Sequence, residues 1–269
     1  MNILIPILAV ALIGLICGVG LAVCSSLMKV KEDERLPLIR QCLPGANCGA
    51  CGYSGCDGYA RALLEPGVKT NLCIPGADAV AMQLSQLLGV AAEDVIEQVA
   101  VVHCGGDCKS APASHDYRGI QSCAAARLLF GGDKHCVYGC LGLGDCAKVC
   151  PKGCIDIRDG IARVDAGQCM GCGLCAKACP QQIISLVPDV GKVVVLCANR
   201  DKGAQTRKDC AAGCIGCKKC EKVCENGAIA VKDNHAAIDY ALCTGCGSCV
   251  QACPTGALQL RDLAGAHQN

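Results

Sequence analysis

Cysteine is the residue type whose number and spacing could support chemistry in this chain. The 269 residues include 29 cysteines, one Phe and no Trp. Two runs, CMGCGLCAKACP at 169–180 and CTGCGSCVQACP at 243–254, share the spacing C-x2-C-x2-C-x3-C-P. This spacing is typical of chains that bind pairs of [4Fe–4S] clusters, in which the fourth Cys ligates the other cluster of the pair. Because such clusters gain or lose one electron, the pattern indicates electron transfer.

An internal repeat extends this pattern upstream of both runs. The first-copy cysteines are Cys136, Cys140, Cys146, Cys150, Cys169, Cys172, Cys175 and Cys179. Their counterparts, all at one constant offset, are Cys210, Cys214, Cys220, Cys224, Cys243, Cys246, Cys249 and Cys253. Between these cysteines, both copies predict a short strand, a turn at Asp159-Gly160 or Asp233-Asn234, and a second strand. We therefore expect two α+β units with two clusters each.

Cross-ligation assigns the ligands within each unit. In the first copy, one cluster is predicted to take Cys150, Cys169, Cys172 and Cys175. In the second copy, the equivalent cluster is predicted to take Cys224, Cys243, Cys246 and Cys249. The other cluster of the first copy takes Cys140, Cys146 and Cys179, and Cys136 is expected as its fourth ligand because Leu143 stands where a middle Cys would be. The other cluster of the second copy takes Cys214, Cys220 and Cys253. Ordinary spacing favours Cys217 as its fourth ligand, whereas the repeat alignment favours Cys210.

A further group of four cysteines precedes the repeat. Cys48, Cys51, Cys56 and Cys73 have the spacing C-x2-C-x4-C-x16-C. Four thiolates suit either an iron–sulfur cluster or zinc. Glycines at 45, 49, 52 and 55 let the backbone turn tightly and aim N–H groups at sulfur, which favours the cluster. Residues 78–101, which follow, predict two short helices with a break at Gly89.

Nine cysteines lie outside these five groups: Cys17, Cys24, Cys42, Cys104, Cys108, Cys123, Cys154, Cys197 and Cys210. Cys104, Cys108 and Cys123 either are structural thiols or begin a sixth metal site, whose fourth ligand the sequence does not reveal. His103 and His135 neighbour cysteines, but they do not alternate with Cys in paired motifs as Rieske ligands would. We expect them to be ordinary core or surface histidines.

The N-terminal segment has a different character. Residues 3–28 form a run without a charge, which as a helix exceeds the ~30 Å hydrocarbon core of a membrane. Lys29, Lys31 and Arg35 follow the run and nothing basic precedes it. The positive-inside rule then predicts an N-terminus outside a cytoplasmic membrane and the bulk of the chain on the reducing, cytoplasmic side. Gly14, Gly18 and Ala22 form a stripe that suits a partner helix.

Composition excludes several classes of function. The net charge of +1 and the scarcity of aromatic residues argue against nucleic-acid binding. The odd number of cysteines and their repeated short spacings argue against a disulfide scaffold. No G-x-G-x-x-G follows a predicted strand and no Walker loop or catalytic triad is recognisable, so we expect no NAD site and no catalytic residues in this chain.

The predicted fold class is α+β, with a single N-terminal transmembrane helix, a small helical 4Fe-4S domain and two bacterial-type two-cluster ferredoxin units. The domain boundaries are 1–28 for the anchor, 33–100 for the 4Fe-4S domain, 101–135 for a Cys-containing linker, and 136–190 and 205–262 for the ferredoxin units. Between residues 192 and 222 there are eight basic and three acidic residues, a local charge of +5. Such a segment is either a solvated linker or a docking surface for an acidic soluble ferredoxin.

The blocks LPGANCGACGYSGCDGYA and CLGLGDCAKVCP, the uncharged anchor and the two ferredoxin units together resemble the B subunits of Rnf complexes. The resemblance covers essentially the whole chain. It implies an electron-transfer subunit of an ion-translocating ferredoxin:NAD oxidoreductase, which accepts electrons from reduced ferredoxin and passes them toward membrane and peripheral partner subunits. The alternatives are a cluster-bearing reductant or regulator of a redox-sensing protein, and a stand-alone membrane polyferredoxin.

Overall fold

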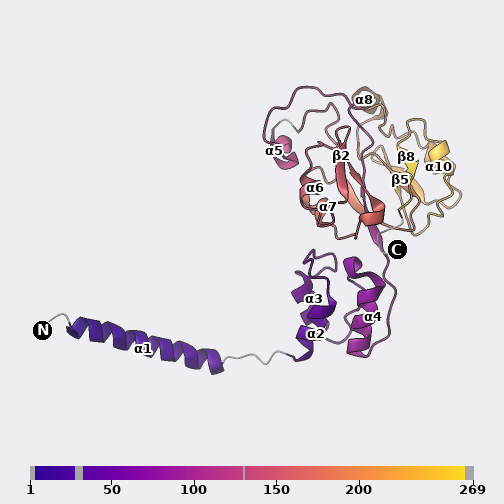
Figure 1. Cartoon of the computed structure of the whole chain (residues 1–269). Helices are drawn as coiled ribbons and strands as arrows, with labels where there is room; N and C mark the ends of the chain where they lie inside the picture. The colour runs from indigo at the N-terminus through magenta and orange to yellow at the C-terminus, as the bar shows by residue number, and fades with distance from the viewer. Residues whose placement is uncertain (1–3, 28–32, 130, 264–269) are drawn as a thin grey trace. The chain divides into compact units, whose positions relative to one another are not determined.

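The computed structural model describes residues 4–27, 33–129 and 131–263. The chain divides into two compact units, Met1–Leu38 and Ile39–Asn269, and each is described by itself. The first unit contains helix α1, Leu4–Leu27, drawn in indigo in Figure 1. Its apolar side chains are exposed, Ile5 at 70% and Leu21 at 73%. Lys29 and Lys31 lie outside the described residues.

Across these described ranges, no helix combines the length and the apolarity that crossing a membrane requires. The transmembrane span over 1–28 therefore stays a prediction.

A helical domain opens the second unit. Its elements are α2 (Arg35–Cys42), which begins in the first unit, α3 (Cys56–Ala62), the 3₁₀ turn η1 (Ile74–Gly76) and α4 (Ala77–Leu88). Ile39, Tyr59, Ala60 and Leu84 form its fully buried core. Helix α4 ends at Gly89, whose φ of 69° is the left-handed conformation that terminates helices.

The expectation of a second helix before residue 101 was wrong. Residues Gln98–Val102, with the sequence QVAVV, form strand β1 instead. Three of the five residues are β-branched valines, which pack well on a pleated surface, and four of the five are buried.

The two ferredoxin units have the same succession of α-helices and strands, and the first has in addition the short 3₁₀ turn η2. The first contains α6 (Asp145–Lys148), β2 (Ile155–Arg158), β3 (Ile161–Val164), η2 (Ala166–Gln168), α7 (Leu174–Ala178) and β4 (Ile184–Pro188). The second contains α9 (Lys219–Lys222), β6 (Ile229–Lys232), β7 (His235–Ile238), α10 (Ser248–Gln251) and β8 (Leu258–Leu260). The starts of the paired helices and strands differ by the same offset as the paired cysteines, so the repeat seen in the sequence is a structural repeat.

Each copy holds two antiparallel strand pairs. β2 pairs with β3 and β6 with β7 in tight hairpins. Both residues of each turn have positive φ, 51° and 75° at Asp159-Gly160 and 48° and 62° at Asp233-Asn234, as a type I′ hairpin requires. The predicted strand–turn–strand segments are therefore confirmed.

The second strand pair of each copy joins segments that are distant in sequence. β1 pairs with β4, and β5 (Val193–Val195) pairs with β8. Each ferredoxin unit thus includes a strand that precedes its predicted start at 136 or 205. Residues between β1 and α6 form an insertion that contains helix α5 (Cys123–Leu128), and residues between β5 and α9 contain α8 (Gly203–Asp209).

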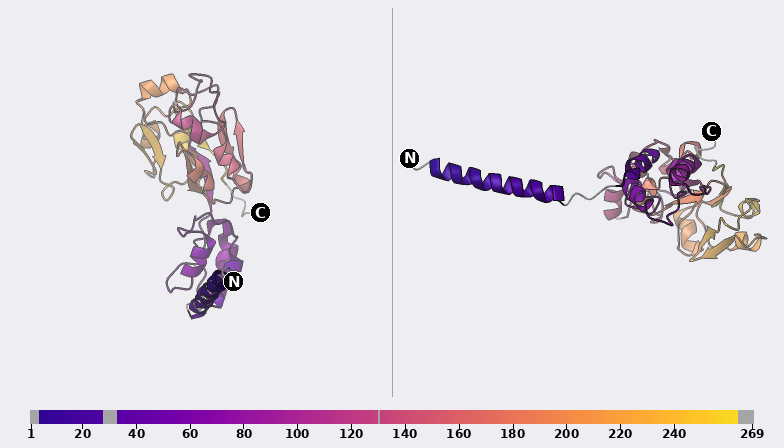
Figure 2. Two further views of the ribbon diagram at one scale, coloured as in Figure 1. Left: turned by 90° about the vertical axis from the view of Figure 1, so that its left-hand side faces the viewer. Right: turned by 90° about the horizontal axis from the view of Figure 1, so that it is seen from below.

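The two copies contact each other directly after β1 and β5. Gly105 N–H donates to Leu196 C=O at 2.8 Å. His103 Nδ1 lies 2.7 Å from Val195 O, and its Nε2 lies 2.6 Å from Ser185 Oγ. Since a carbonyl only accepts, Nδ1 carries the proton, and Nε2 accepts from the serine hydroxyl. His103 is therefore a structural link between the copies, which the views of Figures 1 and 2 show side by side.

Candidate iron–sulfur sites

The cysteines of the helical domain converge as their spacing predicts. Cys48, Cys56 and Cys73 are buried, and Cys51 is half-buried. The pKa of the Cys73 thiol is raised to about 11, first by burial and then by the neighbouring thiols of Cys56, Cys48 and Cys51. Asn47, at φ 46°, accepts a hydrogen bond from the Cys56 N–H at 2.9 Å and fixes the start of α3. Four thiols therefore lie close together, and four thiolates are the donor set that a [4Fe–4S] cluster takes.

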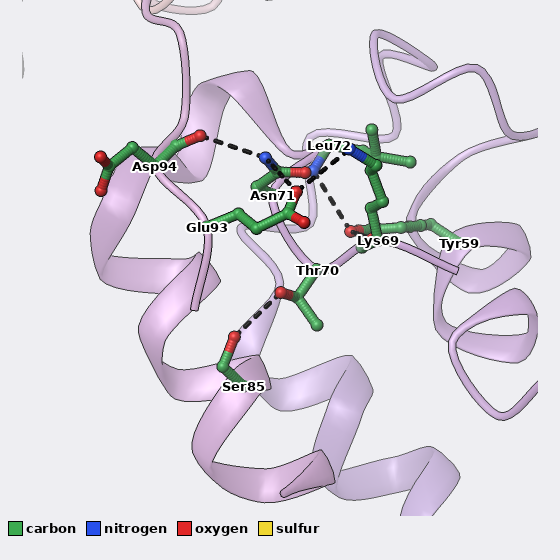
Figure 3. A network of polar contacts seen from close by, with 8 residues as sticks. All are labelled: Tyr59, Lys69, Thr70, Asn71, Leu72, Ser85, Glu93 and Asp94. Carbon is green, nitrogen blue, oxygen red and sulfur yellow. Dashed lines mark hydrogen bonds and ion pairs between the residues drawn. The ribbon is translucent and has the colours of Figure 1, made fainter. Parts of the chain in front are cut away.

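A polar network holds the segment that leads to Cys73 (Figure 3). Tyr59 Oη donates to Lys69 C=O at 2.7 Å and receives the Leu72 N–H at 3.4 Å. The buried hydroxyls of Thr70 and Ser85 lie 2.9 Å apart and tie this segment to α4. Cys73 is far in sequence from the other three cysteines of its group, and these contacts supply the positioning that the short loops give the others.

The group Cys150, Cys169, Cys172 and Cys175 lines one small cavity, as expected. Cys154 lies in the same cavity, with its sulfur 3.4 Å from that of Cys150. The Ala100 N–H of β1 points at Cys169 Sγ at 3.5 Å. Backbone N–H groups aimed at sulfur stabilise a thiolate and the reduced state of a bound cluster.

The other first-copy group differs from the expectation. Cys140, Cys146 and Cys179 share a cavity with Cys123, and Cys136 lies in a different one. The pKa of Cys146 is raised to about 12, first by burial and then by Cys140, Cys123 and Cys179. Cys136 was expected in this group because Leu143 stands where a middle Cys would be, but it is Cys123, from the insertion after β1, that shares the cavity of the other three cysteines.

Asp145 positions Cys123. Its Oδ2 accepts hydrogen bonds from the Ser122 hydroxyl at 2.8 Å and from the Ala124 N–H at 3.0 Å, one residue on either side of Cys123. Burial raises the pKa of Asp145, but these hydrogen bonds and that of Lys148 outweigh it, and the pKa is lowered. Asp145 is also the first residue of α6, which carries Cys146, so one carboxylate connects both helices.

In the second copy, the cysteines of each expected group lie near one another. Cys214, Cys217, Cys220 and Cys253 line one cavity, and Cys210 is not among them. The structure thus agrees with ordinary spacing rather than with the repeat alignment for the fourth cysteine. In the other group, the pKa of Cys249 is raised by burial first and then by Cys224, Cys243 and Cys246.

The helical domain and the first ferredoxin unit are joined at their cysteine groups. Lys177 Nζ donates to Cys48 C=O at 2.6 Å. The pKa of Cys172 is raised first by burial and then by Cys48, ahead of its own group members Cys169 and Cys150. Gly171 leaves room for this approach, because a Cβ there would lie 2.9 Å from Ile74 Cγ2 of the helical domain, as well as 2.3 Å from Gln98 O of β1. The two groups are therefore neighbours.

Single metal ions need a tighter arrangement of donors than a cluster does. In ranges 4–27, 33–129 and 131–263, no group of three or more His, Cys, Asp or Glu side chains is placed to hold one ion. His103 bonds to Val195 and Ser185, and His135 is exposed, so neither of these histidines contributes to a cysteine group.

The strand pairs, the repeated short helices and the cysteine groups define a protein of the ferredoxin class with several iron–sulfur binding domains. Comparison with known families agrees with this class. Residues 43–75 match the family described as "Putative Fe-S cluster", residues 162–185 match a 4Fe-4S binding domain, and residues 213–257 match a 4Fe-4S dicluster domain.

Curated relatives narrow the class to one family. The B subunit of the Na(+)-translocating ferredoxin:NAD(+) oxidoreductase complex of Acetobacterium woodii is 42% identical over 88% of this chain and 72% of its own length. The B subunit of the proton-translocating complex of Clostridium ljungdahlii is 43% identical over 90% and 86%, respectively. The B subunit of the ion-translocating oxidoreductase complex of Methanosarcina acetivorans is 40% identical over 84% and 86%. The chain belongs to the family of B subunits of Rnf-type ion-translocating oxidoreductase complexes, as its sequence blocks indicate.

Proposed function

We propose that this chain is the electron-transfer subunit of a membrane-bound, ion-translocating ferredoxin:NAD oxidoreductase. It accepts electrons from reduced ferredoxin and relays them through [4Fe–4S] clusters toward the membrane subunits. The observation that carries this proposal is the succession of four-cysteine groups through one compact unit, together with membership of the family. Ferredoxin, NAD and the multi-subunit complex are proposed because the names of the relatives include them.

The cysteine groups would hold five clusters. A [4Fe–4S] cluster bound by four thiolates supplies one-electron redox chemistry. The proposed ligand sets are Cys48, Cys51, Cys56, Cys73; Cys150, Cys169, Cys172, Cys175; Cys123, Cys140, Cys146, Cys179; Cys214, Cys217, Cys220, Cys253; and Cys224, Cys243, Cys246, Cys249. Cys123 replaces the expected Cys136 because it shares the cavity of the other three.

Residues outside the ligand sets hold the cysteine groups in position. The contact from Lys177 to Cys48 C=O holds the helical domain against the first ferredoxin unit, and the Asp145 hydrogen bonds hold α5 against α6. Strand β3 aims its Ala162 N–H at Cys140 Sγ at 3.4 Å. These groups fix the distances between neighbouring sites and give sulfur the hydrogen bonds that tune a bound cluster.

A basic surface beside an exposed cysteine supports a docking position for ferredoxin. Lys218, Lys219 and Lys222 are exposed at α9, and Lys218 lines the same cavity as the exposed Cys217. Positive charge next to a solvent-accessible ligand would steer an acidic ferredoxin to this site.

Membrane attachment is proposed for the N-terminal segment 1–28. The uncharged sequence and the exposed apolar side chains of α1 support an insertion with the N-terminus outside and the bulk of the chain on the cytoplasmic side. The partners are then the other membrane and peripheral subunits of the complex, in addition to soluble ferredoxin.

Purification of the tagged full chain from host membranes in mild detergent tests this function. We expect integral-membrane, flavin and NAD-binding partners in the preparation, and ferredoxin-dependent NAD reduction that is lost when the chain is deleted. Isolation of the chain alone, or with a transcription regulator only, would refute the proposal.

Metal analysis tests the cluster sets independently. The five sets require at least about 20 iron atoms per chain, four for each cluster. Twelve or fewer, accompanied by zinc, would refute the ligand sets. Replacing the exposed ligand Cys217 with Ala should remove one electron paramagnetic resonance signal, whereas the matched control Cys108→Ala, at an exposed cysteine outside the groups, should remove none.

A further inference from the structure

Four cysteines that the five sets leave out converge on a single cavity. Cys104, Cys136, Cys197 and Cys210 all line it. Cys136, Cys197 and Cys210 are buried, with 7–8% of their surface exposed, and Cys104 is half-buried. Only Cys197 and Cys210 lie close to each other in sequence, so no short motif announces the group.

The four positions are related by the structural repeat. Cys136 and Cys210 are counterparts in the two copies. Cys104 lies two residues after the end of β1, and Cys197 lies two residues after the end of the equivalent strand β5. Each ferredoxin unit therefore contributes two cysteines from equivalent places to the junction between the units.

The sulfurs of this cavity accept hydrogen bonds from backbone and side-chain N–H groups. Cys197 Sγ accepts from the Cys214 N–H at 3.1 Å and the Asn199 N–H at 3.4 Å. Cys104 Sγ accepts from the Cys140 N–H at 3.3 Å. The Asn199 side chain is 2% exposed, and its Nδ2 donates to Cys136 Sγ at 3.6 Å. A buried amide directed at sulfur is typical of the surroundings of bound clusters.

A glycine, Gly106, lines the same cavity beside the cysteines. A Cβ on Gly106 would lie 3.0 Å from Cys210 Sγ and 3.1 Å from Ala111 Cβ, so a larger residue would crowd the Cys210 thiol. The cavity volume of about 20 Å³ equals that of the cavities at Cys214–Cys253 and Cys123–Cys179. Burial raises the pKa of Cys210 to about 11 and that of Cys197 to about 12, in the same direction and from the same cause as in the motif groups.

We propose that Cys104, Cys136, Cys197 and Cys210 hold a sixth [4Fe–4S] cluster at the junction of the two ferredoxin units. The hydrogen bonds to Cys104 and Cys197 show which other cysteine sets lie next to this site. Cys140, whose N–H donates to Cys104, belongs to the first copy's Cys123–Cys179 set, and Cys214, whose N–H donates to Cys197, belongs to the second copy's Cys214–Cys253 set. The site thus connects cluster sets that otherwise belong to separate units.

The test is iron and sulfide content of the anaerobically prepared full chain, with Cys210→Ala and Cys197→Ala as variants. The matched control is Cys108→Ala, since Cys108 is an exposed cysteine outside all six groups. With four iron atoms per cluster, we expect about 24 iron and about 24 sulfide in the native chain and in the control. Each variant should lose about four of each and one resonance signal, while the other signals persist.

Two results of the metal analysis would overturn the inference. One is about 20 iron in the native chain with unchanged signals in both variants, and the other is about one zinc per chain that is lost on Cys210→Ala. Either result leaves the five sets and the partner complex untouched, so it is distinguishable from failure of the proposed function. Persistence of the other signals shows that a variant has folded; for a variant that does not fold, Asn199→Ala gives a second measurement. Removal of its amide should shift the reduction potential of one cluster without loss of iron, and an unchanged set of potentials would count against the site.

Discussion

Reversal of the basic surface at α9 should slow electron uptake from ferredoxin. The perturbation is Lys218→Glu, Lys219→Glu and Lys222→Glu in one chain, which changes the local charge by six units and turns the 192–222 segment from +5 to −1. The three side chains are exposed, so water screens their interaction with a partner. None of these lysines belongs to a proposed ligand set, so the clusters should remain bound.

The size of the effect follows from Coulomb's law. In water, the interaction energy between one lysine charge and one acidic charge of ferredoxin about 10 Å away is about 0.4 kcal/mol before screening by salt. At about 10 mM salt, six units of change amount to about 1.8 kcal/mol for each facing acidic group, or about 20-fold in the rate of encounter. At about 150 mM salt the same change falls to about 0.7 kcal/mol, or about threefold, and at about 1 M salt the effect nearly vanishes.

Stopped-flow oxidation of reduced ferredoxin by the full chain, measured across this range of salt, gives the rates. The matched control reverses Lys109, Arg118 and Arg158, three exposed basic residues of the first copy and its insertion, with the same change in net charge. Equal slowing by both triple variants would show that net charge rather than this surface controls docking. Unchanged uptake at low salt, with all clusters present, would move the docking site to another face.

Three further substitutions test the geometry of the cysteine groups. Cys123→Ala should remove about four iron atoms and one resonance signal, because Cys123 shares the cavity of Cys140, Cys146 and Cys179; an unaltered iron content would restore Cys136 to that set. Asp145→Ala should lower the free energy of unfolding by about 2 kcal/mol, because the Ser122 hydroxyl and the Ala124 N–H lose their acceptor, and urea denaturation measures this. Gly171→Ala should destabilise the chain by about 2 kcal/mol more than Gly153→Ala, since both glycines have φ near 60° but only the Cβ at 171 would strike Gln98 O; equal losses would show that the backbone conformation alone is responsible.

Local sequence determined the parts of the protein that are built within one loop or one turn. The C-x2-C-x2-C runs place three thiols in one loop, so spacing alone brings together three cysteines of each proposed ligand set. Asp159-Gly160 and Asp233-Asn234 adopt positive φ at low cost and therefore specify their hairpins. The constant offset between paired cysteines predicted a structural repeat because both copies have the same pattern of cysteines and turn residues. The starts of the paired helices and strands differ by the same offset.

Tertiary structure decided which distant segments meet. Residues 98–102 were expected to be helical, and nothing in their sequence QVAVV indicates that they form a strand paired with β4, which follows the whole hairpin of the first copy. The choice of Cys123 over Cys136 depends on the path of the insertion after β1, which Asp145 fixes by hydrogen bonds to α5. Cys104, Cys136, Cys197 and Cys210 meet only because two equivalent strands end side by side, at the contact of Gly105 with Leu196. Spacing specifies which thiols share a loop, whereas thiols from separate elements are brought together by long-range strand pairing and packing, which no local pattern specifies.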